Sequence, residues 1–360
     1  MKYQYKYLHV FFYNDIKFYV PLIKGINHNP LLKPNEHFFI TDKEMVYNEI
    51  KEYNNTLLIK SSHLLKYMAN AKWIILHAMP FKKWQFVFLP NSICKKIIWR
   101  TWGHDIRPWN KANRPIYDLL KYLEFQMFKK KIGKIFAMGV ANGVDIVNIE
   151  EVYEHKFKYF QLIYSDSSQN VDMVKNIMPT QKNIKTNILI GHNSSPVDNH
   201  LEILDKLSKF KNDNIHLVIP LSYSDPKNGY KERVIDKAYH IFGEDNVTIL
   251  NDFIPKEEYI QLISKIDIAI MDMYYSNGLG NISYILYFKK KLYVKKGGNM
   301  DKCFTRAGIM PSYTSDISNQ TFDEFVDNIF DNKYMYFCKG LYDKDFFQNC
   351  WKNFMEQCGE

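Results

Sequence analysis

The most informative stretch of the sequence is IDIAIMDMYYSNGLGNISYILY, residues 266–287. Its first six residues form a short apolar run that is typical of a buried β-strand. Gly278 and Gly280 then bracket a turn, and we expect a helix to begin at Asn281 or Ser283. A strand that runs through a glycine turn into a helix is a β/α unit. Such units predict a parallel sheet with crossover helices.

The same alternation of short strand-like runs and helical segments extends over the rest of the chain. Strand-like runs before residue 175 lie at residues 7–13, 38–41, 56–59, 73–77, 96–99, 134–138 and 159–162. Further runs lie at residues 187–190, 215–220, 247–250, 266–271 and 291–294, with helical segments at 199–210, 231–242, 256–265 and 283–289. The polar segment 177–186, which contains a proline, separates the two series and has the composition of a linker.

This pattern predicts an α/β protein with two β/α domains of similar size. We place the N-terminal domain at residues 1–176 and the C-terminal domain at residues 187–340. Residues 341–360 include a helical segment with an apolar stripe on one face, formed by Phe346, Phe347, Cys350, Trp351 and Phe354. We expect this helix to cross back and pack on the N-terminal domain.

The composition is that of a folded, basic protein. Hydrophobic residues make up 46% of the 360 and charged residues 24%, a balance that excludes a disordered chain. The formal charge of +9 favours an anionic partner such as a nucleotide, a phospholipid surface or a nucleic acid. No run reaches 18 consecutive apolar residues, and the first residues lack a signal-peptide cleavage site.

Cysteine usage favours a reducing compartment. The five cysteines are odd in number and form no CxxC pair, which argues against a disulfide framework or a structural zinc site. There is no HExxH motif either. We therefore expect a cytoplasmic protein without a built-in transition-metal site.

Open β/α sheets bind ligands outside the carboxyl ends of their strands, so the strand-to-helix turns are candidate sites. The turn after residue 190 offers a glycine for close backbone approach and three hydrogen-bonding side chains: Gly191, Asn193, Ser194 and Ser195. An ordinary connection in which Asp198 caps the following helix explains the same residues. At the next turn, Ser222 and Tyr223 leave the strand and Tyr230 stands on the following helix, so a tyrosine could stack on a base or bond a phosphate.

The glycine turn quoted above is the third candidate. Glycines leave an anion free access to the N–H groups of a helix start, whose dipole contributes about 0.3–1 kcal/mol per charge. We predict a diphosphate cradle formed by the backbone of Gly278, Leu279, Gly280 and Asn281, with Ser283 beside it. The sequence contains neither a full dinucleotide fingerprint nor a P-loop.

The N-terminal half contains a fourth candidate, RTWGHDIRP at residues 100–108. Asp105 is a candidate general base, and His104 is a candidate acid, base or phosphate ligand. A surface turn in which Asp105 pairs with Arg100 or Arg107 is the alternative explanation.

A basic cluster follows that motif. Lysines alternate with aromatic and aliphatic residues at Lys121, Lys129, Lys130, Lys131 and Lys134. Docking on an anionic leaflet would gain about 1 kcal/mol per lysine near the surface, whereas a solvated helix face explains the same pattern. The aromatic segment 81–88 would add contact with lipid or belong to the core.

Four of these motifs resemble, in order and rough spacing, those of a known enzyme family. WGHD at residues 102–105 is similar to the WGxD of the TDP-N-acetylfucosamine:lipid II N-acetylfucosaminyltransferases, glycosyltransferase family 56. Residues 191–200 resemble the family's GNS…NxH stretch, residues 219–223 its VPxxY turn, and residues 278–281 its GIGT turn. Three positions depart from that pattern: His104 stands where the family has a small residue, His192 interrupts the GNS start, and Asn281 replaces a threonine.

The resemblance implies a GT-B fold, in which two Rossmann-like domains face an inter-domain cleft. It implies a fucosyltransferase-like hexosyltransferase that moves a deoxy-amino sugar such as N-acetylfucosamine from TDP or UDP to a lipid-linked or other glycan acceptor. That reaction belongs to bacterial surface polysaccharide synthesis, at the inner face of the cell membrane. Enzymes of this fold usually need no bound metal, because helix N-termini and side chains stabilise the leaving diphosphate.

The same resemblance assigns roles to the candidate residues. The nucleotide-sugar site would be lined by Gly191, Asn193, Ser194, Ser222, Tyr223 and Tyr230, beside the diphosphate cradle. Asp105 would deprotonate the acceptor hydroxyl if the reaction inverts, with His104 beside it. Two other classes of function stay open at this point: a non-catalytic basic module that binds nucleic acid or anionic surfaces, and a GT-B-fold sugar epimerase.

Overall fold

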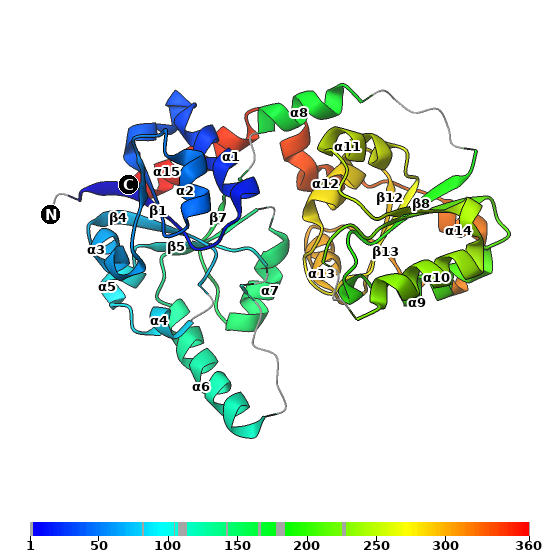
Figure 1. Cartoon of the computed structure of the whole chain (residues 1–360), viewed down its shortest axis with the longest axis horizontal. Coiled ribbons are helices and arrows are strands. Elements are labelled where there is room, and N and C mark those ends of the chain that lie inside the picture. The colour runs from blue at the N-terminus through cyan, green and yellow to red at the C-terminus, as the bar shows by residue number, and fades with distance from the viewer. Residues whose placement is uncertain are drawn as a thin grey trace. The chain divides into compact units, whose positions relative to one another are not determined.

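The structure, a computed structural model, divides the chain into two compact units. It describes residues 3–80, 83–103, 105–106, 114–141, 143–164, 167–177, 184–224 and 228–359. Unit 1 comprises residues 1–167 and 344–360, and unit 2 comprises residues 168–343 (Figure 1). The division falls at the start of helix α8 (Ser167–Lys175), whereas the sequence pattern predicted it after residue 176. Six residues of the predicted linker, 178–183, lie outside the described residues.

Unit 1 is built on a seven-stranded parallel sheet with the strand order β3-β2-β1-β4-β5-β6-β7. Its strands are β1 (Tyr5–Phe11), β2 (His37–Thr41), β3 (Thr56–Leu58), β4 (Ala71–His77), β5 (Ile97–Arg100), β6 (Ala137–Val140) and β7 (Tyr159–Gln161). Its helices are α1 (Ile16–Asn27), α2 (Glu44–Ile50), α3 (Leu64–Ala69), α4 (Lys83–Val87), α5 (Asn91–Cys94), α6 (Pro115–Ile132), α7 (Val144–Tyr153) and α15 (Phe346–Gly359).

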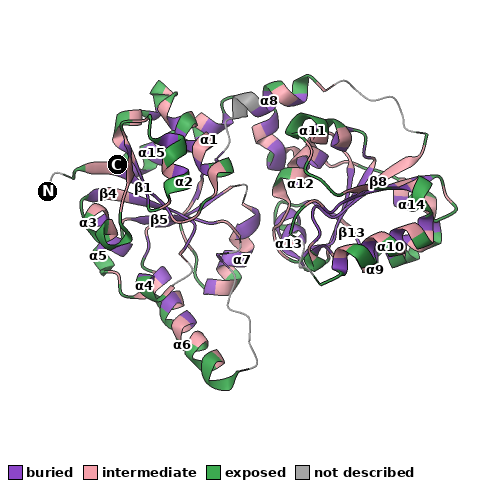
Figure 2. Cartoon of the chain, viewed as in Figure 1, coloured by how far each residue is buried: buried purple, intermediate pink, exposed green. Residues whose placement is uncertain are grey.

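Both faces of this sheet are buried, because successive side chains of a strand point to opposite faces. In β1, Leu8 and Val10 belong to one hydrophobic cluster, and Tyr7 and Phe11 belong to the cluster on the other face. Figure 2 shows the strands almost wholly buried between helices whose outer sides are exposed. The continuous apolar runs in the sequence are therefore core strands.

The C-terminal helix α15 completes the second of these clusters. The indole of Trp351 donates to the carbonyl of Ile163 at 3.0 Å, and Trp73 donates to the carbonyl of Cys358 at 2.8 Å. Phe354 is fully buried and packs edge-on against Phe160, with ring centroids 5.0 Å apart. The prediction that the apolar stripe of this helix packs on the N-terminal domain is confirmed.

Three buried histidines form a hydrogen-bonded chain through the same face of the unit 1 sheet. The distances between ring nitrogens are 2.9 Å from His37 to His9 and 2.9 Å from His9 to His77. The hydroxyl of Tyr164 lies 2.9 Å from His77 Nδ1 and accepts from the indole of Trp102 at 2.6 Å. When Tyr164 donates to His77 Nδ1, each histidine in turn donates from Nε2. Burial lowers the pKa of all three histidines, so they are neutral.

Unit 2 is built on a six-stranded parallel sheet with the strand order β10-β9-β8-β11-β12-β13. Its strands are β8 (Thr186–Ile190), β9 (Ile215–Pro220), β10 (Val247–Leu250), β11 (Ile268–Met271), β12 (Lys291–Val294) and β13 (Ser312–Tyr313). Its remaining helices are α9 (His200–Leu207), α10 (Tyr230–Phe242), α11 (Lys256–Ser264), α12 (Leu279–Tyr287), α13 (Asn299–Arg306) and α14 (Phe322–Val326).

The two-domain α/β prediction is confirmed, and the differences from it are local. Strand β1 begins and ends two residues earlier than predicted, and β6 covers Ala137–Val140 rather than residues 134–138. Strand β13 has only two residues, too few for a strand pattern to be recognised. Helix α12 begins at Leu279, ahead of the predicted start at Asn281 or Ser283, because Gly278 turns the chain directly into the helix.

Candidate functional site

The strand order of unit 2 marks the place where a ligand site is expected. The first strand, β8, lies between β9 and β11, so the chain reverses its direction of strand addition between β8 and β11. Ligands of open α/β sheets bind outside the carboxyl ends of the strands at such a reversal. The residues that follow β8 and β11 flank this position, and they include two of the three predicted turns.

The loop after β8 is organised by one buried carboxylate. Asp198 Oδ2 accepts from the backbone N–H groups of His192 at 2.8 Å and Asn193 at 3.1 Å. The sequence pattern predicted that Asp198 caps helix α9, and this prediction is wrong. It ends the short 3-10 helix Pro196–Asp198, and Asn199, with φ 58°, occupies the N-cap position of α9.

The missing side chain of Gly191 is required by the protein's own packing. Its φ is +68°, and a Cβ atom there would lie 2.5 Å from His200 Nε2 and 2.9 Å from Asp198 Oδ2. The close approach predicted for a ligand at Gly191 is thus made by two buried side chains of the same loop.

Residues predicted to bond the ligand also hold this loop together. Ser194 is fully buried and donates its hydroxyl to the carbonyl of Tyr223 at 2.7 Å. The amide oxygen of Asn193 accepts from the backbone N–H of Ser195 at 2.7 Å. This bond directs the Asn193 amide nitrogen toward the ring of His192, 3.0 Å from its Nε2.

His192 is a candidate site residue that the sequence pattern did not identify as such. Because Asn193 donates to Nε2, the ring proton of neutral His192 belongs on Nδ1, which lies 2.8 Å from Asp198 Oδ2 without good hydrogen-bond geometry. On its other side, the ring approaches the start of α12 so closely that a Cβ on Gly278 would lie 3.0 Å from His192 Cγ. His192 thus joins the β8 loop to the loop after β11.

The start of helix α12 is open to an anion. Gly278, with φ +62°, is the N-cap residue, and no side chain caps the helix. The first helical backbone bond is donated by Ile282, and within the described part of the chain the N–H groups of Leu279, Gly280 and Asn281 have no acceptor. A Cβ on Gly280 would meet no atom within 4 Å, and the first turn carries no acidic residue.

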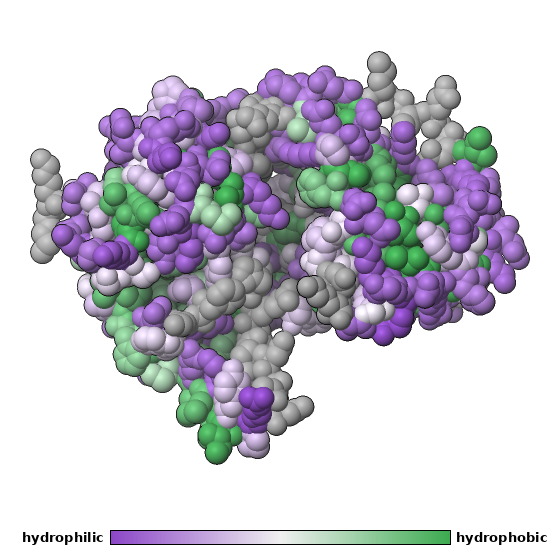
Figure 3. Space-filling view, viewed as in Figure 1, coloured by the Kyte–Doolittle hydropathy of each residue, from purple (hydrophilic) through white to green (hydrophobic). Residues whose placement is uncertain are grey.

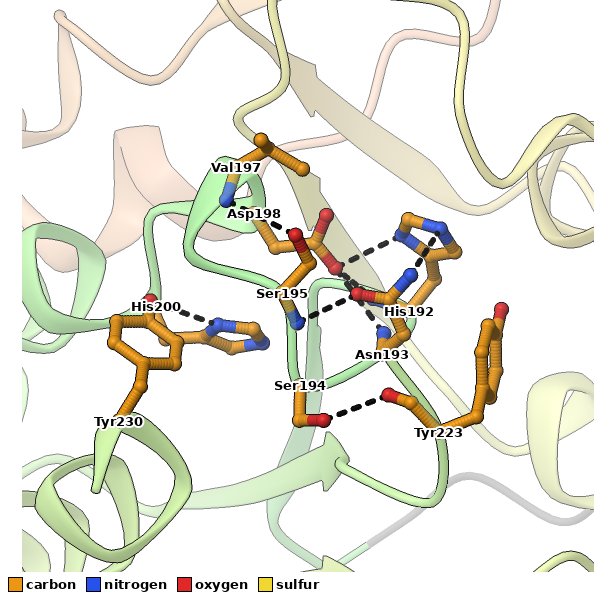
Figure 4. A network of polar contacts seen from close by, with 9 residues as sticks. All are labelled: His192, Asn193, Ser194, Ser195, Val197, Asp198, His200, Tyr223 and Tyr230. Atoms are coloured by element: carbon orange, nitrogen blue, oxygen red, sulfur yellow. Dashed lines mark hydrogen bonds and ion pairs between the residues drawn. The ribbon is translucent and has the colours of Figure 1, made fainter. Parts of the chain in front are cut away.

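The other predicted residues of this region divide into two groups (Figure 4). Tyr223 is half-exposed and lies on the same side of the loop as His192, with the two ring centroids 6.1 Å apart. Tyr230 lies on the opposite side, buried in the core, and its hydroxyl is 3.3 Å from His200 Nδ1. Burial lowers the pKa of His200 to about 4, so this histidine is neutral at physiological pH.

Two serines complete the predicted set. The hydroxyl of Ser283 donates to the carbonyl of Leu279 at 2.9 Å within α12, so it bonds the helix itself. Ser222 is partly buried at the end of the β9 turn beside Tyr223. Of the predicted site residues, the structure therefore brings Tyr223 and the start of α12 together around His192.

A second residue that the sequence pattern missed is Asp272, directly after β11. Its buried carboxylate accepts from Asn199 Nδ2 at 2.6 Å, from Thr314 Oγ1 at 2.5 Å and from Lys295 Nζ at 3.2 Å. These partners follow β8, β13 and β12, so Asp272 fixes the loops along the carboxyl edge of the sheet. Its contacts depend on strand order, which a local pattern does not contain.

In unit 1, Asp105 is buried and holds its own loop. Its Oδ2 accepts from the backbone of Met79 at 2.9 Å and from the indole of Trp99 at 2.8 Å, and its Oδ1 accepts from the backbone of Trp102 at 2.8 Å. All three donors are N–H groups of neighbouring loops and strands. His104, predicted as its catalytic neighbour, lies outside the described residues.

Within the described ranges, no group of three or more His, Cys, Asp and Glu side chains could hold a metal ion. None of the helices in those ranges has the length and apolarity needed to cross a membrane.

Comparison with solved structures identifies the architecture. The chain is similar to a glycosyltransferase from Rickettsia africae, with a TM-score of 0.63 and 12% identity over 98% of this chain and 97% of that one. It is similar to HepE from Anabaena, solved in complex with UDP, with a TM-score of 0.60 and 10% identity over 98% and 99% of the two chains. The S. aureus MnaA–UDP structure matches with a TM-score of 0.52 and 11% identity over 99% and 97%.

Two parallel-sheet domains with this likeness define the GT-B fold of nucleotide-sugar glycosyltransferases and their relatives. Residues 39–344 match the family described as 4-alpha-L-fucosyltransferase, glycosyl transferase group 56. The chain therefore belongs to glycosyltransferase family 56 and is a transferase, which confirms the resemblance of the four sequence motifs.

Proposed function

We propose that this protein transfers a sugar from a nucleoside diphosphate, and that the leaving diphosphate binds at the start of helix α12. One observation carries this proposal: an uncapped helix N-terminus with three free N–H groups lies against His192 at the strand-order reversal of unit 2. Free N–H groups and the positive end of the helix dipole favour a diphosphate over a neutral ligand. That Anabaena HepE and S. aureus MnaA were solved with UDP supports the same ligand class for this chain.

Within this site, we assign His192 and Tyr223 to the donor. The ring of His192 lies beside the helix start, where its packing against Gly278 positions the cradle. Tyr223, half-exposed next to it, provides a surface on which a base or sugar ring can pack. Because the free N–H groups and the dipole of α12 stabilise the leaving diphosphate, we propose that the reaction needs no bound metal.

We also propose a transferred group and an acceptor, for which the family gives support. Membership of family 56 supports a deoxy-amino sugar such as N-acetylfucosamine, carried on TDP or UDP, and a lipid-linked or other glycan acceptor in bacterial surface polysaccharide synthesis. Asp105, with His104 beside it, is the proposed base for the acceptor hydroxyl. The same membership favours an enzyme over the non-catalytic binding module, and sugar transfer over epimerisation.

We propose that the protein acts at the inner membrane face, where it would meet a lipid-linked acceptor. We propose that the lysines of α6, together with Lys134 two residues beyond its end, contribute attraction to anionic lipid. Lys121 and Lys129 are paired with Glu124 at 2.5 Å and Glu154 at 2.7 Å, which reduces their share. Lys130 and Lys134 are exposed and take part in none of the ion pairs of the described residues.

A thermal-shift screen tests the proposed donor. A ligand that binds only the folded state stabilises it by mass action, by about 2.7 kcal/mol at a concentration of 100 times the Kd. TDP, UDP and their sugars should raise the melting temperature, whereas AMP and free sugars should not. Equal shifts for all nucleotides, or no shift with any diphosphate, would contradict the proposal.

A further inference from the structure

Within the described residues, the buried side chains of helix α6 all lie in its second half. Its buried residues are Phe125, Phe128 and Ile132, and Phe128 packs edge-on against Phe86 of α4 with ring centroids 5.5 Å apart. The first half, from Pro115 to Glu124, contains no buried residue, and it extends away from the sheet (Figure 1).

This projecting half is strongly apolar. Among the 23 exposed large hydrophobic side chains of the described residues, seven lie on this helix: Ile116, Tyr117, Leu119, Leu120, Tyr122, Leu123 and Met127. Ile116 is 78% exposed and Leu120 is 60% exposed. Figure 3 shows apolar side chains gathered at the free end of α6. We call residues 116–123 the α6 tip.

The spacing of the exposed apolar residues gives helix α6 a second apolar face. Ile116, Leu120, Leu123 and Met127 recur at intervals of four, three and four residues, so they line one side of the helix. The buried Phe125 and Phe128 lie on the other side, against α4. Packing within unit 1 therefore explains only one of the two faces.

We infer that the α6 tip inserts into an anionic membrane, at the boundary between the lipid headgroups and the acyl chains. Charge selects this occupant: Lys129, Lys130 and Lys131 follow the apolar face in the last turn, and Lys134 follows the helix. Lysines near a helix C-terminus also interact favourably with the helix dipole. This effect does not explain why leucines are exposed in the first half of the helix. A second copy of the chain would meet these lysines with its own, and protein interfaces are depleted in lysine.

The dimensions of the helix agree with this inference. Ile116 and Leu123 are seven residues apart, about 10 Å along the axis, and Lys130 lies about 10 Å further. Interfacial helices bury their apolar face about 5–10 Å into the boundary of headgroups and acyl chains. Such a helix lies along the membrane surface, so the lysines that follow the apolar face along the axis stay at the level of the lipid headgroups. The inference rests on the proposed lipid-linked acceptor, whose membrane the tip would reach.

Vesicle flotation with the double variant Leu120→Asp plus Leu123→Asp tests the insertion. Both residues are exposed, so the fold should tolerate the change. The matched control is Leu65→Asp plus Met310→Asp, which changes the same number of exposed apolar residues and the same charge elsewhere. With vesicles of phosphatidylcholine containing 30% phosphatidylglycerol, the tip variant should bind at least tenfold more weakly than wild type and the control as wild type.

The inference would be overturned if the tip variant bound vesicles as tightly as wild type, or if the control lost binding to the same extent. It would also be overturned if the wild-type chain bound equally well to vesicles of pure phosphatidylcholine. A fourth contrary result is a tip variant whose molar mass in sedimentation equilibrium differs from that of wild type while its vesicle binding does not. The last would identify a second copy as the occupant. TDP and UDP affinity, measured in parallel without vesicles, reports on the donor site alone, so failure of the proposed function is distinguishable from failure of the membrane contact.

Discussion

At the scale of single residues, His192 has the widest consequences because it links two loops that are remote in sequence. Asp198 and Asn193 fix its ring from within the β8 loop, and Gly278 lies against it from the start of α12. A histidine held in this way needs little reordering when a diphosphate arrives, which favours binding.

Replacing His192 with alanine should weaken TDP or UDP binding by about tenfold or more, since the ring that positions the start of α12 is lost and the cradle is no longer preorganised. Isothermal titration calorimetry measures the change. His240→Ala, an exposed histidine on α10 of the same unit, is the matched control and should bind as wild type. Unchanged affinity in the His192 variant would remove this residue from the donor site.

Asp105 has two roles that one substitution can separate. Asp105→Asn keeps the shape but turns an NH2 group toward N–H donors, so the free energy of unfolding should fall by about 1–3 kcal/mol. If Asp105 also accepts the acceptor's proton, turnover at saturating substrates should fall by about 100-fold or more at a temperature where the variant is folded. Wild-type turnover in the folded variant would leave Asp105 with its positioning role alone.

From the sequence we could predict which residues lie in the loops of this site, but not which partners they contact. Gly191, Ser194 and Tyr230 were predicted to line the ligand, yet they pack or bond within the protein. Small polar residues after a strand serve loop and ligand equally well, and only the partners on other strands decide between them. His192 was overlooked because Gly278, 86 residues later, sets its position.

At the scale of elements, α12 is the part of the molecule that the proposed chemistry uses most. Its position after β11 was predicted from the glycine turn, although it starts at Leu279, within the predicted cradle. A helix start with free N–H groups and no acidic side chain in its first turn is suited to an anion.

Gly280→Val should separate ligand binding from stability. The new side chain meets no atom of the protein within 4 Å at its Cβ, and valine has a higher helix propensity than glycine, so stability should not fall and should rise by no more than about 0.5 kcal/mol. The same side chain occupies the space above the free N–H groups, so TDP or UDP affinity should fall at least tenfold.

The control for this element is Gly359→Val in α15, another helical glycine with open space at its Cβ. Calorimetry with nucleotide and urea unfolding give the two readouts for both variants. A Gly280→Val chain that binds diphosphate as tightly as wild type would place the ligand elsewhere.

Most other elements were predictable because apolar runs and glycine turns are local signals. Strands β9, β10 and β12 have the predicted bounds. The order of the strands in the sheet could not be predicted from such signals, and that order brings His192 to α12 and Asn199 to Asp272.

At the scale of the whole molecule, buried histidines make the free energy of unfolding depend on pH. Burial lowers the pKa of His37 to about 3 and that of His200 to about 4, and it lowers the pKa values of His9 and His77 well below the ordinary value. In the unfolded chain all four titrate near 6.5. Below that pH, the unfolded state binds protons that the folded state does not bind, so stability falls as the pH falls.

Between about pH 6 and pH 4, each such histidine should cost about 1.4 kcal/mol per pH unit. Three of the four lie in unit 1, which should therefore unfold first in acid. All six tryptophans also lie in unit 1, so indole fluorescence during urea unfolding reports on it alone. A urea midpoint that stays constant from pH 7 to pH 5 would contradict this account.

The central claim is that the open start of α12 holds the diphosphate of the donor. Diffraction from crystals of the full chain soaked with TDP or UDP tests it most directly. The account predicts diphosphate oxygens within hydrogen-bond distance of the backbone nitrogens of Leu279, Gly280 and Asn281, with His192 in contact. A nucleotide bound elsewhere, with those N–H groups capped by the protein's own side chains, would contradict it.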